Sequence, residues 1–93
     1  WTKDLAKFSL SLVDGNLPFG IYHGTNSGEA TWYTWAKEIL EIRGLEIELR
    51  KNIMANFQSV GKSAPRPQYG ILLNTKAPPM RPWQEALKDY LNQ

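Results

Sequence analysis

The hydrophobic positions of residues 31–43 recur with the spacing of a single buried helix face. Thr31 precedes this predicted helix as an N-cap, and Gly44 follows it as a left-handed stop. A short strand over residues 20–25 and a turn over residues 26–30 come directly before it. We expect this strand, turn and helix to form the packing centre of the fold. The apolar stripe, at i, i+3, i+4, i+7 and i+8, consists of Trp32, Trp35, Ala36, Ile39 and Leu40.

Two further helices are predicted near the ends of the chain. Residues 2–14 form the first, with Thr2 as N-cap, Asp4 at the positive end of the helix dipole and Gly15 as its end. Its inner stripe consists of Leu5, Phe8, Leu12 and Val13. The last helix opens with Pro82 at its first position, where a missing N–H costs nothing. Its inner face consists of Trp83, Ala86, Leu87, Tyr90 and Leu91.

The middle of the chain carries shorter elements. Residues 44–49 alternate apolar and acidic side chains, which predicts a half-buried strand with one wet face. Residues 71–73 predict a short strand or a turn, and the apolar spacing within residues 50–60 allows a helical turn. The predicted fold class is therefore α+β, with three main helices and short strands in one region that spans residues 1–93.

Composition narrows the class of protein. The chain of 93 residues is 42% hydrophobic with four tryptophans, which is enough for a small core. Its net charge is only +2, and basic and acidic residues are interspersed, which argues against a nucleic-acid partner. The chain has no cysteine and no apolar run near the roughly 20 residues of a membrane span. We expect a cytoplasmic protein with no membrane partner.

Four sequence blocks resemble one known family, in the same order. Residues 20–40 read GIYHGTNSGEATWYTWAKEIL, and residues 2–6 read TKDLA. Residues 66–74 read RPQYGILLN, and residues 82–91 read PWQEALKDYL. Together these blocks are similar to the C-terminal part of dTDP-4-dehydrorhamnose reductases, which are extended short-chain dehydrogenases that use NAD(P)H.

The resemblance implies a nucleotide-sugar-binding region without the catalytic half of such an enzyme. A Rossmann domain with the NAD(P)H site and the catalytic residues would precede Trp1, so we expect no cofactor, metal or catalytic residue in this chain. The chain starts without Met, and we expect it to be a piece of a longer protein. Its missing N-terminal domain is then an expected partner, and the separated piece should self-associate into homo-oligomers through exposed apolar surface.

Arg66 is the principal candidate for binding the diphosphate of a dTDP-linked sugar. Pro65 and Pro67 stiffen the basic loop over residues 61–69 and present the arginine, whose guanidinium can meet two phosphate oxygens. The alternative is a surface arginine in a salt bridge. Candidates for contacts to the base or the sugar are Gln68, Tyr69 and Asn74.

Two other features carry weaker chemical signals. Tyr33 and Lys37 form a literal Y-x-x-x-K, but no nucleotide-binding sheet precedes them, so we interpret them as an exposed tyrosine and a solvated lysine. His23 is the only histidine, which does not predict a metal site. It can line a substrate cleft at the end of the predicted strand, or serve as a hydrogen-bonded structural histidine.

The resemblance predicts a substrate-binding fragment of a reductase that acts on the 4-keto group of dTDP-6-deoxy-L-lyxo-4-hexulose. Two departures from the family pattern concern the substrate. Gly70 replaces a serine of the family. The segment between Leu73 and Trp83 is shorter than in the family, so we expect a bend at residues 77–79 in place of a small helix. The alternatives are a non-catalytic regulatory or interaction subunit of the same fold, and a reductase or epimerase of another nucleotide-sugar.

Overall fold

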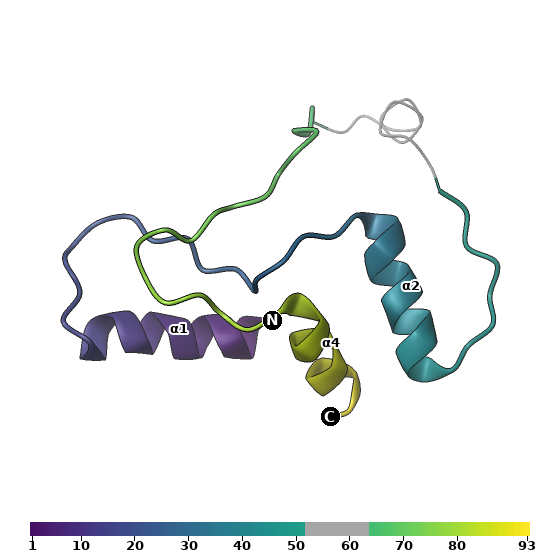
Figure 1. Ribbon diagram of the computed structural model, residues 1–93, viewed down its shortest axis with the longest axis horizontal. Coiled ribbons are helices and arrows are strands. Elements are labelled where there is room, and N and C mark those ends of the chain that lie inside the picture. Colours follow the sequence, from purple (N-terminus) through teal and green to yellow (C-terminus); the bar gives the residue numbers. More distant parts are fainter. Residues whose placement is uncertain (52–63) are drawn as a thin grey trace. The chain divides into compact units, whose positions relative to one another are not determined.

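The computed structural model describes residues 1–51 and 64–93 as two compact units. The first unit joins residues 1–29 to residues 72–93 and contains the helices α1 (Thr2–Asp14) and α4 (Trp83–Leu91). The second unit spans residues 30–71 and contains α2 (Trp32–Arg43) (Figure 1). Most of the helical turn predicted within residues 50–60 lies outside the described residues. No helix in the described ranges is long and apolar enough to cross a membrane.

The ends of the helices agree with the sequence to within one residue. The N-cap of α2 is confirmed, because the Thr31 hydroxyl accepts the N–H of Thr34 at 3.1 Å. Gly44 ends α2 in the left-handed conformation, with φ 65° and ψ 32°. Thr2 is already helical rather than an N-cap, and no side chain caps α1. Pro82 lies just before α4 instead of at its first position.

The predicted strands are wrong for the part of the chain that the structure describes. Within residues 1–51 and 64–93, the segments 20–25, 44–49 and 71–73 form no strand ladder, and the one isolated parallel bridge joins Ser27 to Pro82. An alternating pattern identifies the face that a strand would bury, but a strand exists only beside a partner. Since none of these segments has a partner strand among the described residues, the α+β class reduces there to helices joined by segments without regular secondary structure.

The packing centre also differs from the predicted one. No residue of α2 is buried, and the Trp32 side chain is 78% exposed while it packs edge-to-face with Trp35 at a centroid distance of 6.0 Å. A periodic apolar stripe indicates that one helix face is apolar, but it does not indicate which part of the protein packs against that face. The buried apolar residues of the described chain instead lie on α1 and α4 in the first unit: Phe8, Ala86 and Leu87.

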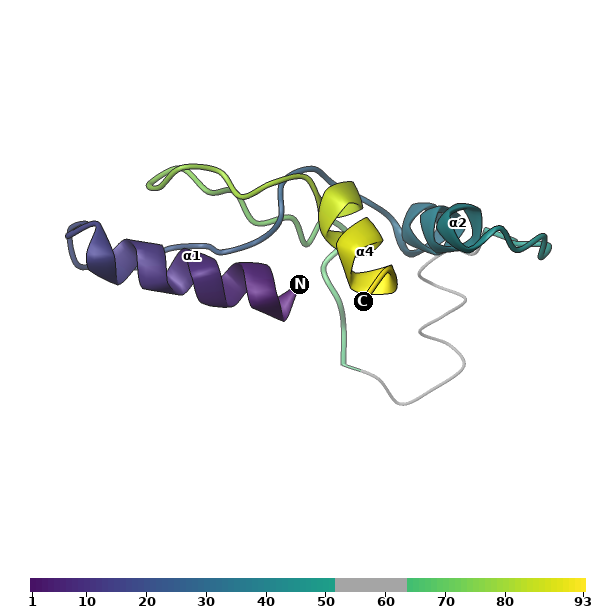
Figure 2. The same ribbon diagram turned by 90° about the horizontal axis from the view of Figure 1, so that it is seen from below.

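The first unit is assembled from segments that are distant in the sequence. The N-terminal end of α1 lies beside α4 (Figure 1 and Figure 2), where Trp1 and Tyr90 meet edge-to-face at 6.4 Å. The segment after α1 packs back onto that helix at Gly24. A Cβ atom at Gly24 would lie 2.8 Å from Leu5 Cδ1 and 2.9 Å from Phe8 Cδ1, so only glycine fits there without a shift of its neighbours.

Candidate functional site

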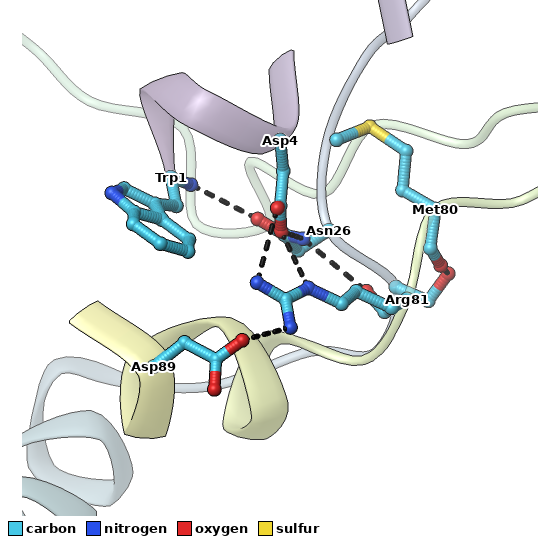
Figure 3. Close-up of polar contacts among 7 residues, drawn as sticks. Trp1, Asp4, Asn26, Met80, Arg81 and Asp89 are labelled. Carbon is cyan, nitrogen blue, oxygen red and sulfur yellow. Dashed lines mark hydrogen bonds and ion pairs between the residues drawn. The ribbon is translucent and has the colours of Figure 1, made fainter. Parts of the chain in front are cut away.

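An ion pair between Asp4 and Arg81 is the polar centre of the first unit (Figure 3). The Nε and Nη2 atoms of Arg81 donate to Oδ2 and Oδ1 of Asp4 at 2.9 and 3.1 Å. A third guanidinium nitrogen, Nη1, donates to Asp89 of α4. The guanidinium also lies 5.5 Å from the ring centroid of Trp1. With three of its nitrogens paired and one face over a ring, Arg81 joins α1 to α4.

Asn26 completes this cluster from the segment that follows α1. Its Nδ2 donates to Oδ2 of Asp4 at 2.7 Å and to the carbonyl of Arg81 at 3.3 Å. Its Oδ1 accepts a hydrogen bond from the amino group of Trp1 at 3.0 Å. One amide side chain therefore links three separate stretches of the chain.

The charges in the cluster stabilise each other. Hydrogen bonding from Arg81 lowers the pKa of Asp4 below its ordinary value of 3.8, with a further contribution from Asn26, and this outweighs the opposing effect of burial. The bonds to Asp4 and Asp89 raise the pKa of Arg81 above its ordinary value. Asp4 is only 9% exposed, and burial alone would favour its neutral form. Its hydrogen-bond partners keep it ionised near neutral pH. This arrangement suits a structural clamp better than a ligand-binding arginine.

The sequence did not reveal this cluster. The position of Asp4 in the first turn predicts only an interaction with the helix dipole, and Arg81 stands outside the predicted last helix. Their separation of 77 residues leaves no local pattern that would pair them. The one available signal is that each lies in or beside a block that resembles the reductase family.

Two hollows flank the first unit. The larger has a volume of about 510 Å³ and runs along α1 beside the cluster. Its charged lining residues are Lys3, Asp4, Lys7, Arg81 and Asp89. The smaller has a volume of about 260 Å³ and lies between the segment after α1 and the segment before α4. Its lining residues are Ile21, Tyr22, His23, Leu73, Asn74, Thr75 and Lys76.

The smaller hollow brings together two of the predicted site residues, His23 and Asn74. His23 is exposed at its wall. The amide group of Asn74 shapes the local turn, because its Oδ1 accepts the N–H of Ala77 at 3.2 Å and its Nδ2 donates to the carbonyl of Pro78 at 3.1 Å. Asn74 therefore already has a structural task, and its role in ligand binding stays a prediction.

The other three predicted residues lie in the second unit. Arg66, Gln68 and Tyr69 are exposed on the segment of residues 64–71, which has no regular secondary structure, and Tyr69 is 80% exposed. Neither of the two hollows described above is lined by them. Their roles stay predictions.

The Y-x-x-x-K pair has the surroundings of a helix surface. The Lys37 ammonium lies 4.0 Å from the carboxylate of Glu41 one turn further along α2, and both side chains are exposed. The ring of Tyr33 faces the ammonium of Lys51 at 5.0 Å. Each residue of the pair thus has a charged contact other than its partner in the motif. Within the described ranges, no group of three or more histidine, aspartate or glutamate side chains is placed to hold a metal ion.

The comparison with protein families decides where the chain belongs. The family model described as the RmlD substrate binding domain matches residues 1–93, which is the whole sequence. The chain belongs to the RmlD substrate-binding domain family. This agrees with the resemblance seen in the four sequence blocks. The helices, the Asp4–Arg81 cluster and the two hollows are therefore features of an RmlD substrate-binding domain.

Several curated relatives of this RmlD domain are named for work on sugars. The chain is 37% identical over 97 residues to the spore coat polysaccharide biosynthesis protein SpsK of Bacillus subtilis. It is 34% identical over 95 residues to a probable dTDP-4,6-dihydroxy-2-methyloxan-3-one 4-ketoreductase of Streptomyces antibioticus. It is also 32% identical over 94 residues to a dTDP-4-dehydrorhamnose reductase of Mycolicibacterium smegmatis.

These matches cover 96–100% of the RmlD domain but only 28–32% of each relative, so the chain spans about a third of the length of the curated relatives it matches. No solved structure shows a significant match to the chain.

Proposed function

We propose that this chain is the nucleotide-sugar-binding region of an NAD(P)H-dependent dTDP-4-dehydrorhamnose reductase. The observation that carries the proposal is the match of the RmlD substrate binding domain to all 93 residues. Its support comes from relatives named as reductases of dTDP-linked sugars, at 31–34% identity. The proposed reaction of the longer protein is reduction of the 4-keto group of dTDP-6-deoxy-L-lyxo-4-hexulose.

The proposed contribution of this chain is to bind and orient the substrate. In this proposal the nicotinamide cofactor lies in the longer protein, because this sequence contains no G-x-x-G-x-x-G run, and this chain is assigned no step of the reaction. Holding the reacting sugar in one geometry lowers the barrier without acid–base chemistry in this region. The exposed Arg66, with its two flanking prolines, is the proposed grip on the diphosphate.

Titration of dTDP into the 93-residue chain tests this role. We expect saturable binding that becomes roughly tenfold weaker in the variant Arg66→Ala, the loss typical of one charged hydrogen-bonding group. Arg43→Ala is the matched control, because Arg43 is also an exposed arginine of the second unit but lies at the end of α2. Equal weakening in both variants would assign the effect to net charge, and unchanged binding in Arg66→Ala would remove the proposed role of Arg66.

A second candidate function is reduction of a different dTDP-linked keto sugar. The observation in its favour is that two relatives are named for other substrates, a 4-ketoreductase of Streptomyces antibioticus and a dTDP-4-keto-6-deoxy-D-glucose reductase of Streptomyces niveus. Turnover of the longer protein with these keto sugars, compared at equal concentration, distinguishes the two functions. Turnover of a GDP- or UDP-linked sugar in preference to both would exclude them.

We also propose that the apolar face of α2 is covered by the remainder of the longer protein. The exposure of Trp32 and Trp35, at 78% and 42%, supports this proposal. The isolated chain should then self-associate as its concentration rises and should bind a hydrophobic dye. Sedimentation of a monomer at high concentration, without dye binding, would contradict it.

A further inference from the structure

The smaller hollow of the first unit carries the side chains that a phosphate group requires. His23, Thr75 and Lys76 lie on its wall and supply an imidazole, a hydroxyl and an ammonium group. Among the described residues, none that lines this hollow is acidic. A wall with a fixed positive charge, several donors and no competing carboxylate favours an anion.

Lys76 is held over the hollow by its neighbours. Its ammonium lies 5.9 Å from the ring centroid of Tyr22, a cation–π contact. The hydroxyl of Tyr22 in turn donates to the carbonyl of Pro18 at 2.5 Å, which fixes the ring. A Cβ atom at Gly20 would lie 3.8 Å from the same ammonium, so the lysine passes close to the backbone there. A side chain already confined in this way loses less freedom when it binds a ligand.

The turn that carries Thr75 and Lys76 is shaped by the side chain of Asn74. The side chain of Asn74 accepts the N–H of Ala77 at 3.2 Å and donates to the carbonyl of Pro78 at 3.1 Å. These two hydrogen bonds span the turn and fix its backbone. The backbone that carries Thr75 and Lys76 is therefore ordered before binding, which reduces the ordering cost.

The larger hollow is the poorer anion site, although it has more basic residues. Lys3 and Lys7 share its wall with Asp4 and Asp89, and Arg81 is already paired with both aspartates. The positive charge of that hollow is thus largely balanced within the protein. In the smaller hollow, Lys76 forms no ion pair with any described residue, so its charge is available to a ligand.

We propose that His23, Thr75 and Lys76 form a binding site for a phosphate group. The volume of about 260 Å³ lies just below the range of about 300–1,000 Å³ typical of whole small-molecule sites. It suits one phosphate or diphosphate moiety rather than a complete nucleotide-sugar. The bound phosphate is either part of a nucleotide-sugar or free inorganic phosphate. The proposed site rests on the proposed function only for the choice between these two ligands.

The test is a titration of the isotope-labelled 93-residue chain with pyrophosphate, followed by amide chemical shifts at constant ionic strength. We expect saturable shifts at His23, Thr75 and Lys76. The variant Lys76→Gln should weaken the affinity roughly three- to tenfold, the range for losing one charged contact at an exposed site. The control Lys88→Gln removes the same charge from the exposed face of α4 and should leave the affinity unchanged.

Parallel titrations with dTDP and thymidine separate this proposal from the proposed function. If dTDP binds the hollow more tightly than pyrophosphate does, and thymidine does not, the nucleotide-sugar is the carrier. If pyrophosphate fills the hollow and dTDP binds no better, the phosphate site stands while the nucleotide-sugar role loses its support. If dTDP shifts only residues 66–69 and Lys76→Gln has no effect, the phosphate site is overturned and the proposed function stands.

Two further outcomes decide the proposal. The absence of saturable shifts at the hollow with both ligands overturns it. If Lys76→Gln does not retain the amide dispersion of the original chain, the variant Thr75→Val replaces it, because it removes a hydroxyl donor at similar volume. An unchanged pyrophosphate affinity in a folded Thr75→Val variant would overturn the part assigned to Thr75, and a lower affinity supports it.

Discussion

Arg81 binds the carboxylate of Asp4 through both Nε and Nη2, at 2.9 and 3.1 Å, although 77 residues separate them in the sequence. The pair joins the first turn of α1 to the segment just before α4, where Arg81 precedes Pro82. Asp4 is 9% exposed and the Arg81 side chain 31%, so water screens the interaction only in part. The two-point geometry requires a planar guanidinium, which lysine does not supply.

The variant Asp4→Asn should lower the free energy of unfolding of the first unit by about 1–2 kcal/mol. It keeps the size of the side chain but removes the charge that Arg81 and Asn26 bind, and the partial exposure of Arg81 limits the loss. Urea unfolding followed by tryptophan fluorescence measures it. The control Asp14→Asn, at the exposed end of α1, should change stability by less than about 0.5 kcal/mol. Equal losses in the two variants would contradict the role of the pair.

Acid should weaken the first unit through the same carboxylate. The pKa of Asp4 is lower in the folded chain than its ordinary value of 3.8, so the folded state binds this proton less readily than the unfolded state does. The resulting stability is therefore fully present above pH 3.8 and is lost as the pH falls through the lowered pKa. Urea midpoints of the original chain should fall more between about pH 5 and about pH 2 than those of Asp4→Asn. Parallel curves would show that Asp4 does not govern the acid response.

The variant Gly24→Ala should destabilise the first unit by about 1–3 kcal/mol, the usual cost of overpacking. Its methyl group would lie 2.8 Å from Leu5 and 2.9 Å from Phe8, and Phe8 is one of the buried core residues. Thermal unfolding followed by circular dichroism measures the change. Gly70→Ala is the matched control, because its nearest contact outside its chain neighbours, Pro67, would lie at an ordinary 3.7 Å. A similar loss of stability in Gly70→Ala would contradict the steric explanation.

The variant Thr31→Ala should reduce the helicity of α2 by removing its N-cap, at a cost of about 1 kcal/mol. The hydroxyl of Thr31 accepts the N–H of Thr34 at 3.1 Å, and no residue of α2 is buried to compensate for the loss. Amide hydrogen exchange at Thr34 should accelerate. Thr25→Ala, an exposed threonine outside the helices, serves as the control and should leave this rate unchanged. An unaltered rate in Thr31→Ala would show that the cap does not limit the opening of α2.

The sequence predicts the helices well because their signals are local. The spacing of the apolar residues, Thr31 before α2 and Gly44 after it all act within a few residues, and the observed bounds differ by at most one residue. The prediction of strands was wrong because a strand requires a partner strand, which residues 44–49 do not have among the described residues. The predicted packing centre was wrong for a related reason. The stripe that contains Trp32 and Trp35 identifies an apolar helix face but does not identify the surface that this face contacts.

The candidate site was also predicted only in part. The sequence pointed to His23 and Asn74 separately, and the structure places both in one hollow with Lys76, which the sequence did not single out. The pairing of Asp4 with Arg81 was not predicted, because charge complementarity between distant residues has no periodic signature. Long-range polar contacts of this kind become visible only once the chain path is known.

The isolated bridge between Ser27 and Pro82 has a consequence for the order in which the first unit folds. The helix α4 starts without a side-chain cap, and the amide of its first residue, Trp83, donates instead to the carbonyl of Ser27 at 3.0 Å. A segment more than half the chain earlier therefore completes the first turn of this helix. The end of α4 nearest Pro82 should stay frayed until that segment arrives, which makes it a late reporter of native topology even though its sequence is strongly helical.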